Sequence, residues 1–163
     1  MIIAPILIPL IFAATTLLLW RKPRLQKQLA IIGALLLTGI AAWILFIVQK
    51  YGIQTLQVGG WEAPYGISLV VDLFSAIMLL IAGVVALGVS IYSQAQMDMP
   101  RIRFGFYPLY FFLLMGVNGA FTAGDLFNLY VWFEVMLMAS FVLIALGGER
   151  AQIEGAVKYL ILN

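Results

Sequence analysis

The chain has 163 residues, of which 64% are hydrophobic and 10% charged. Soluble domains carry about 25% charged residues, so this composition excludes a soluble protein and indicates a bilayer protein. The net charge is +2 and the chain has neither cysteine nor histidine, which excludes disulfides, thiolate metal sites and histidine-based proton or metal chemistry.

Apolar runs separated by short polar segments predict an all-α polytopic membrane protein, because a helix of about 20 apolar residues crosses the hydrocarbon layer. We expect about six transmembrane helices, over residues 2–20, 29–48, 69–92, 105–123, 126–146 and from 153 onward. The sixth run is still apolar at residue 162, so we expect a truncated last helix and a chain that is the front part of a longer protein.

Basic residues are distributed unevenly among the connections between these runs. Residues 21–28 hold four, residues 93–103 hold two, and the segment before the sixth run holds Arg150. The alternate connections are poor in basic residues: residues 49–68 hold only Lys50, and 123–125 hold none. The positive-inside rule therefore predicts an external N-terminus and three cytoplasmic basic connections.

The outer loop 49–68 is too polar and glycine-rich to span a membrane. Gly59 and Gly60 lie between the segments "TLQV" and "WEAPYGIS". This pattern is typical of a tight β-hairpin, although an irregular loop accounts for it equally well.

Glu134 is the one ionisable residue in an otherwise apolar run, "LYVWFEVMLMASFVL". It lies about 12 Å along the fifth helix from Leu126, where a charge costs about 2.5–3.5 kcal/mol on insertion scales. One interpretation is a proton or cation relay facing a hydrated interior. The other is a neutral glutamic acid that only ties helices together by hydrogen bonds.

Two other acids lie near predicted helix starts. We expect Asp72 to stabilise the positive end of the third helix and Asp125 to cap the fifth. Ion transport is the alternative function for both residues.

Glu154 and Lys158 open the sixth helix with the acid four residues before the base, the favourable order for a helical ion pair. Lys158 is either a relay partner whose charge responds to nearby ions or an anchor that snorkels to the membrane surface. It lies on the helix after that of Glu134, so a contact between the two is possible.

The fourth run holds Gly116 and Ala120 at a small-xxx-small spacing that favours close helix packing. Asn118 is the one amide in this run, and we expect it to hydrogen-bond to a neighbouring helix. The tyrosines and tryptophans mostly fit the aromatic belts found at membrane interfaces.

The segments "GFYPLY", "GVNGAF", "GDLFNLYVWFEVMLMASFVLIALGG" and "EGAVKYLILN" strongly resemble the D subunit of Mrp-type multisubunit monovalent cation/proton antiporters. That family is homologous to the proton-pumping, antiporter-like subunits of respiratory complex I and membrane-bound hydrogenases. The resemblance covers most of the chain and is weakest over the first fifty or so residues.

The resemblance implies about fourteen transmembrane helices with two inverted five-helix repeats. Residues 1–104 would hold three leading helices, and residues 105–163 would begin the first repeat. Glu134 matches the family's fifth-helix glutamate, which works with a lysine on a seventh helix that this chain does not contain. Lys158 is carried over only as a candidate partner.

We therefore expect a transporter subunit, not an enzyme, that exchanges Na⁺ or another monovalent cation for H⁺ across a bacterial or archaeal cytoplasmic membrane. Its partners would be the lipid bilayer and other integral membrane subunits, with no cofactor and no nucleic acid. The alternative is a proton-translocating subunit of a complex I-like NADH-quinone oxidoreductase or a membrane-bound hydrogenase. A third hypothesis is a scaffold subunit without conduction.

Overall fold

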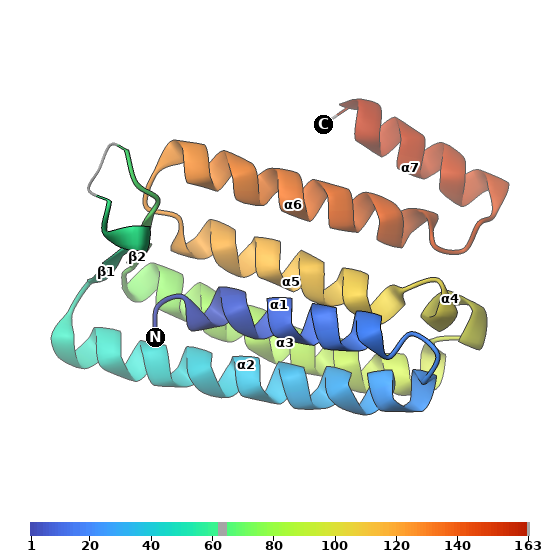
Figure 1. Ribbon diagram of the computed structural model, residues 1–163, viewed down its shortest axis with the longest axis horizontal. Coiled ribbons are helices and arrows are strands. Elements are labelled where there is room, and N and C mark those ends of the chain that lie inside the picture. The colour runs from blue at the N-terminus through green and yellow to red at the C-terminus, as the bar shows by residue number, and fades with distance from the viewer. Residues whose placement is uncertain (62–64, 163) are drawn as a thin grey trace.

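Seven α-helices and one two-stranded hairpin form the described part of the chain, residues 1–61 and 65–162 of a computed structural model (Figure 1). The elements in chain order are α1 (Ala4–Leu18), α2 (Pro23–Tyr51), β1 (Gln54–Gln57), the 3₁₀ turn η1 (Val58–Gly60), β2 (Ser68–Val71), α3 (Leu73–Gln96), α4 (Met99–Arg103), α5 (Phe106–Thr122), α6 (Leu126–Ala145) and α7 (Arg150–Leu162). The expected all-α membrane fold is confirmed, with the hairpin as an addition.

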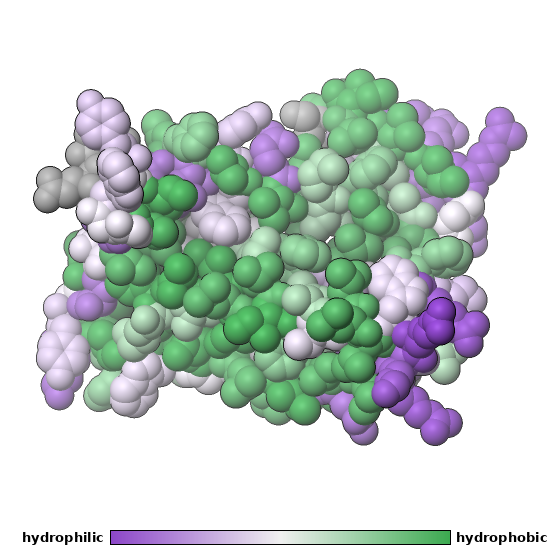
Figure 2. Space-filling model, viewed as in Figure 1, coloured by the Kyte–Doolittle hydropathy of each residue, from purple (hydrophilic) through white to green (hydrophobic). Residues whose placement is uncertain are grey.

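The long helices lie roughly along one axis. α1, α2, α3 and α5 form a bundle, α6 packs along α5, and α7 packs on α6 at the edge of the molecule (Figure 1). The three basic connections gather at one end, while the hairpin and the α5–α6 turn lie at the other. Hydrophilic side chains mark the basic end, and apolar side chains cover the middle (Figure 2). This arrangement agrees with the predicted topology, in which these connections are cytoplasmic.

Three helices are long and apolar enough to cross a membrane by length and composition, namely α2, α3 and α6. α1 and α5 are apolar but shorter, with 15 and 17 residues. The predicted number of six spans, like the external N-terminus, stays a prediction.

The third helix begins later than expected because residues 68–71 form a strand. β2 pairs antiparallel with β1, from Gln54 opposite Val71 to Gln57 opposite Ser68. The Asp72 carboxylate then accepts a hydrogen bond from the Ser75 backbone N–H at 2.7 Å and caps α3. That bond lowers the pKa of the Asp72 carboxyl below its ordinary value of 3.8. The helix-start role predicted for Asp72 is confirmed.

The hairpin interpretation of the outer loop is confirmed, but its turn is not tight. Residues 58–67 separate the strands, and Gly59 and Gly60 both adopt a φ of +73° that favours glycine. The part of this loop over residues 62–64 lies outside the described residues.

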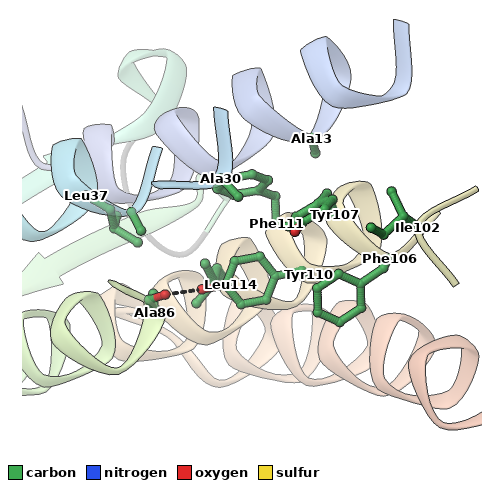
Figure 3. Packing of buried hydrophobic residues seen from close by; sticks show 11 residues of the cluster. Ala13, Ala30, Leu37, Ala86, Ile102, Phe106, Tyr107, Tyr110, Phe111 and Leu114 are labelled. Carbon is green, nitrogen blue, oxygen red and sulfur yellow. Dashed lines mark hydrogen bonds between the residues drawn. The ribbon is translucent and has the colours of Figure 1, made fainter. Parts of the chain in front are cut away.

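The core of the bundle is aromatic, which differs from the expectation that the aromatics mostly form interface belts. Tyr107 and Phe111 are fully buried, and Tyr110 is 6% exposed. The Tyr110 hydroxyl donates to the Ala86 carbonyl oxygen at 2.6 Å (Figure 3), which links α5 to α3. These tyrosines belong to the core because a neighbouring helix satisfies their hydroxyl groups.

The basic connection between α3 and α5 contains the short helix α4, which the sequence did not lead us to expect. Asp98 precedes it, Pro100 lies in its first turn, and Arg101 pairs with Asp98 at 3.6 Å. Proline suits a first helical turn because its missing N–H would lack a partner there anyway.

Candidate functional site

Glu134 lies near the middle of α6, the least buried of the three long apolar helices. It is eight positions after Leu126, so it lies about 12 Å along a helix that is about 30 Å long. Its side chain is exposed in this chain, and no described basic side chain forms an ion pair with it. The expected mid-helix position is confirmed, whereas its role stays a prediction.

Asp125 sets the start of α6. One oxygen of its carboxylate accepts from the Asn128 backbone N–H at 2.7 Å, which confirms the predicted cap. The other oxygen accepts from the Ser68 N–H of β2 at 3.3 Å. The Gly124 N–H also donates to the Ser68 carbonyl oxygen at 2.8 Å. The hairpin is therefore tied to the start of the helix that carries Glu134.

Close packing against α5 sets the lateral position of α6. A methyl group at Gly116 would lie 2.7 Å from Cγ of Met136, and one at Gly119 would overlap the indole of Trp132. The predicted close approach through small residues is thus confirmed at Gly116, and Gly119 contributes to it as well. Trp132 packs into the bundle and does not belong to an interface belt.

Asn118 lies on the same helix and contacts α1. Its Nδ2 donates to the Pro5 carbonyl oxygen at 2.9 Å, and the side chain is fully buried. The predicted interhelical hydrogen bond of Asn118 is confirmed.

Glu134 lines two clefts, each of about 480 Å³. The first, which we call the apolar cleft, lies between α5 and α6, and its other lining side chains are all apolar: Leu109, Phe112, Met115, Val131, Val135, Met138, Ala139 and Val142. The second, the hydroxyl cleft, lies between α5, α6 and α7 and is lined by Leu113, Tyr130, Phe133, Met136, Leu137, Ser140 and Tyr159. The carboxylate thus stands between an apolar and a polar environment.

The three polar residues of the hydroxyl cleft were missed by the sequence analysis. Tyr130 lies one turn before Glu134 on α6, and its hydroxyl interacts with the Glu134 carboxylate. Ser140 Oγ lies 3.3 Å from the Tyr159 hydroxyl oxygen on α7. A helical wheel would have placed Tyr130 and Glu134 on one face of α6, because they are four residues apart. Ser140 lies about 120° around the helix from Glu134, and α7 contributes Tyr159 only in three dimensions.

Lys158 forms an ion pair with Glu154 within α7, at 2.6 Å between Nζ and Oε1. Both side chains are largely exposed, at 69% and 62%. The predicted helical ion pair is confirmed. The structure does not bring Lys158 into an ion pair with Glu134, and the relay role of Lys158 stays untested.

The candidate site consists of one carboxylate with an apolar cleft on one side and a cleft with hydroxyl groups on the other. A carboxylate beside an apolar wall favours its neutral form, whereas hydration or a nearby cation favours its charged form. Within the described residues, no three acidic side chains gather in a way that could hold a metal ion. Glu134 with its hydroxyl neighbours is therefore the candidate site.

The chain is 42% identical, over its whole length, to the D subunit of the Na⁺/H⁺ antiporter of Alkalihalophilus pseudofirmus. The chain is thus similar to Na⁺/H⁺ antiporter D subunits over about a third of their length, 33%. No family model matches the chain.

Two solved membrane complexes contain chains with the same fold. A chain of an archaeal membrane-bound sulfane sulfur reductase, a respiratory complex, superposes with a TM-score of 0.91 at 29% identity and covers 99% of this chain. A chain of the Mrp complex from a Dietzia species superposes with a TM-score of 0.84 at 25% identity and covers 98%. The present chain covers 33% and 31% of those two chains. The same fold thus occurs in an Mrp complex and in a respiratory complex.

Proposed function

We propose that this chain is part of a proton-conducting subunit of a multisubunit Na⁺/H⁺ antiporter, in which Glu134 binds and releases the transported proton. The observation that carries this proposal is a carboxylate at the middle of an apolar helix, between the apolar cleft and the hydroxyl cleft. The similarity to a Na⁺/H⁺ antiporter D subunit supports the choice of transported ions.

The proposed cycle needs only a change in the surroundings of Glu134. In dry surroundings the acid holds its proton, and in wet or positively charged surroundings it releases the proton. Lys158 is the candidate source of positive charge. Its ion pair with Glu154 is exposed, and exposed pairs contribute little stability, so the pair can open at low cost. An anchoring role at the membrane surface is the alternative for Lys158.

We place the chain in a bacterial or archaeal cytoplasmic membrane, in contact with lipid and with other integral membrane subunits. Residues 1–104 would form the leading helices and residues 105–163 the start of an antiporter repeat. The chain would act as a transporter subunit and not as an enzyme, with H⁺ and Na⁺, or another monovalent cation, as its cargo. The cycle requires no cofactor.

A redox-driven proton pump is the second candidate, because the respiratory reductase chain superposes with the higher TM-score. The same Glu134 chemistry would then be driven by electron transfer in other subunits. Vesicles that contain the intact complex distinguish the two. A Na⁺ pulse should dissipate an imposed pH gradient in the antiporter, whereas only an electron donor should generate such a gradient in the pump.

Glu134→Gln in the intact complex tests the proposed site. Glutamine keeps the size and hydrogen-bonding capacity of the side chain but cannot carry a proton, so we expect Na⁺-dependent dissipation of the pH gradient to fall to background. Asp98→Asn is the matched control, because it removes an acid from the cytoplasmic end and should leave exchange unchanged.

Full exchange by the Glu134→Gln complex, at normal abundance, would refute the relay role and favour a scaffold subunit. If exchange needs the positive charge at residue 158, the Lys158→Met variant should exchange slowly and the Lys158→Arg variant should exchange at the wild-type rate. Equal rates for both variants would assign Lys158 to anchoring.

A further inference from the structure

The hydroxyl cleft contains a second polar feature besides the Tyr130–Glu134 contact. Ser140 Oγ lies 3.3 Å from the Tyr159 hydroxyl oxygen and 2.9 Å from the Leu137 carbonyl oxygen. Both side chains are partly buried. They line the same cleft as Glu134. Because α6 runs from the hairpin end to the basic end (Figure 1), Ser140 follows Glu134 in the direction of the basic end.

Ser140 has one hydroxyl hydrogen and two acceptors within reach. When that hydrogen points to the Leu137 carbonyl, the lone pairs of Oγ are available to accept a proton from Tyr159. When the Ser140 hydrogen points to Tyr159 instead, the Leu137 carbonyl oxygen loses the hydrogen bond from the Ser140 side chain but stays within the helix backbone. A hydroxyl with two such orientations can reset itself after a proton has passed, which a single fixed hydrogen bond cannot do.

Glu134 and Ser140 are six residues apart, or roughly 9 Å along the helix axis, too far for a direct hydrogen bond. The hydroxyl cleft has a volume of about 480 Å³, and a water molecule occupies about 30 Å³ in the liquid. The cleft as a whole therefore has room for several waters, and Glu134, Ser140 and Tyr159 are polar partners for them on its walls.

We propose that the Ser140–Tyr159 pair, together with water in the hydroxyl cleft, is the entry arm through which protons reach Glu134. This inference rests on the proposed function of Glu134 and assigns two further residues to it. In each passage one hydroxyl oxygen accepts a proton and releases its own hydrogen to the next oxygen in the row. The Glu134 carboxylate takes up the last proton, and both hydroxyl groups end unchanged after rotation.

The test uses Tyr159→Phe and Ser140→Ala in the intact complex, with Na⁺-dependent exchange measured in vesicles between about pH 6 and pH 9. Loss of a positioned proton-transfer group costs on the order of a hundredfold, so we expect exchange to slow at least about tenfold even if water partly substitutes. The solvent deuterium isotope effect should rise, because proton entry becomes rate-limiting. Ser140→Thr keeps a hydroxyl and should restore the rate.

A matched control exists elsewhere in the chain. Ser93 and Tyr107 form a similar buried pair at 3.2 Å between α3 and α5, and neither residue lines a cleft with Glu134. Ser93→Ala and Tyr107→Phe should leave the rate and the isotope effect unchanged. Because both variants interrupt the same row, the slowing factors of the two single variants should not multiply in the double variant.

The outcomes separate this inference from the proposed function. If Glu134→Gln abolishes exchange while Tyr159→Phe and Ser140→Ala keep the wild-type rate, pH profile and isotope effect, the entry arm is wrong and the Glu134 site stands. If Glu134→Gln keeps full exchange, the proposed function itself fails. Equal slowing by Ser140→Ala and Ser140→Thr would assign Ser140 to packing and overturn its role in the arm.

Discussion

Pro9 has no backbone N–H, so the Pro5 carbonyl, four residues earlier in α1, lacks its usual intrahelical donor. Lipid offers no replacement, because every backbone polar group at membrane depth must be satisfied within the protein. Asn118 supplies the missing donor from α5, at 2.9 Å to the Pro5 oxygen. This amide is therefore matched to a defect that a proline creates in another helix.

Asn118→Leu should lower the free energy of unfolding by about 1–2 kcal/mol, since the Pro5 carbonyl loses its donor. Pro9→Ala restores a backbone N–H to that carbonyl, so the same Asn118→Leu change should cost less than half as much in a Pro9→Ala background. Unfolding of the purified protein in mixed detergent micelles measures both values. Equal costs in the two backgrounds would show that Asn118 does not act through the Pro5 carbonyl.

At the scale of elements, α6 is positioned by two sets of contacts that do not involve Glu134. The hairpin is hydrogen-bonded to the Asp125 carboxylate at the start of α6. Trp132 of α6 packs against Gly119 of α5. Such contacts set the depth and rotation of the helix, and thereby the two clefts that Glu134 faces. The chemistry of the candidate site thus depends on the packing of Trp132 and on the bonds of Asp125.

Gly119→Ala should disrupt the α5–α6 contact, because the added methyl group overlaps the Trp132 indole. Overpacking of this kind lowers the free energy of unfolding by about 1–3 kcal/mol. Because α6 would shift, we also expect Na⁺-dependent exchange to slow. Gly88→Ala is the matched control, since its methyl group would meet nothing within 4 Å and alanine favours a helix over glycine. In detergent, the thermal unfolding midpoint of the Gly119→Ala variant should lie several degrees below that of the Gly88→Ala variant.

At the scale of the whole molecule, polarity divides the chain into two ends and an apolar middle (Figure 2). The basic end holds the connections around Arg21 and Arg150 together with α4, and the hairpin lies at the opposite end (Figure 1). Positive charge favours the cytoplasmic side of a membrane. The hairpin should therefore face the outside.

Residues 1–163 contain no cysteine, so a single introduced cysteine is the one maleimide target within this chain. We expect Thr55→Cys in β1 to react with a membrane-impermeant maleimide in intact cells, and Ala95→Cys near the end of α3 to react only after permeabilisation. Both positions are exposed in the structure, so a difference would report the side of the membrane and not burial. The reverse pattern would invert the predicted orientation.

The amino-acid sequence by itself determined the membrane environment, the helical class, the caps at Asp72 and Asp125, the ion pair of Glu154 with Lys158, and the mid-helix position of Glu134. These features depend on composition, on helical periodicity and on contacts within about four residues, which a linear sequence displays directly. The hydroxyl cleft, the tie from the hairpin to Asp125, the match of Asn118 to Pro5 and the burial of Tyr107 were decided only by the tertiary structure. Each joins segments far apart in the chain, and their pairing depends on which faces of the helices pack together, which no local pattern specifies.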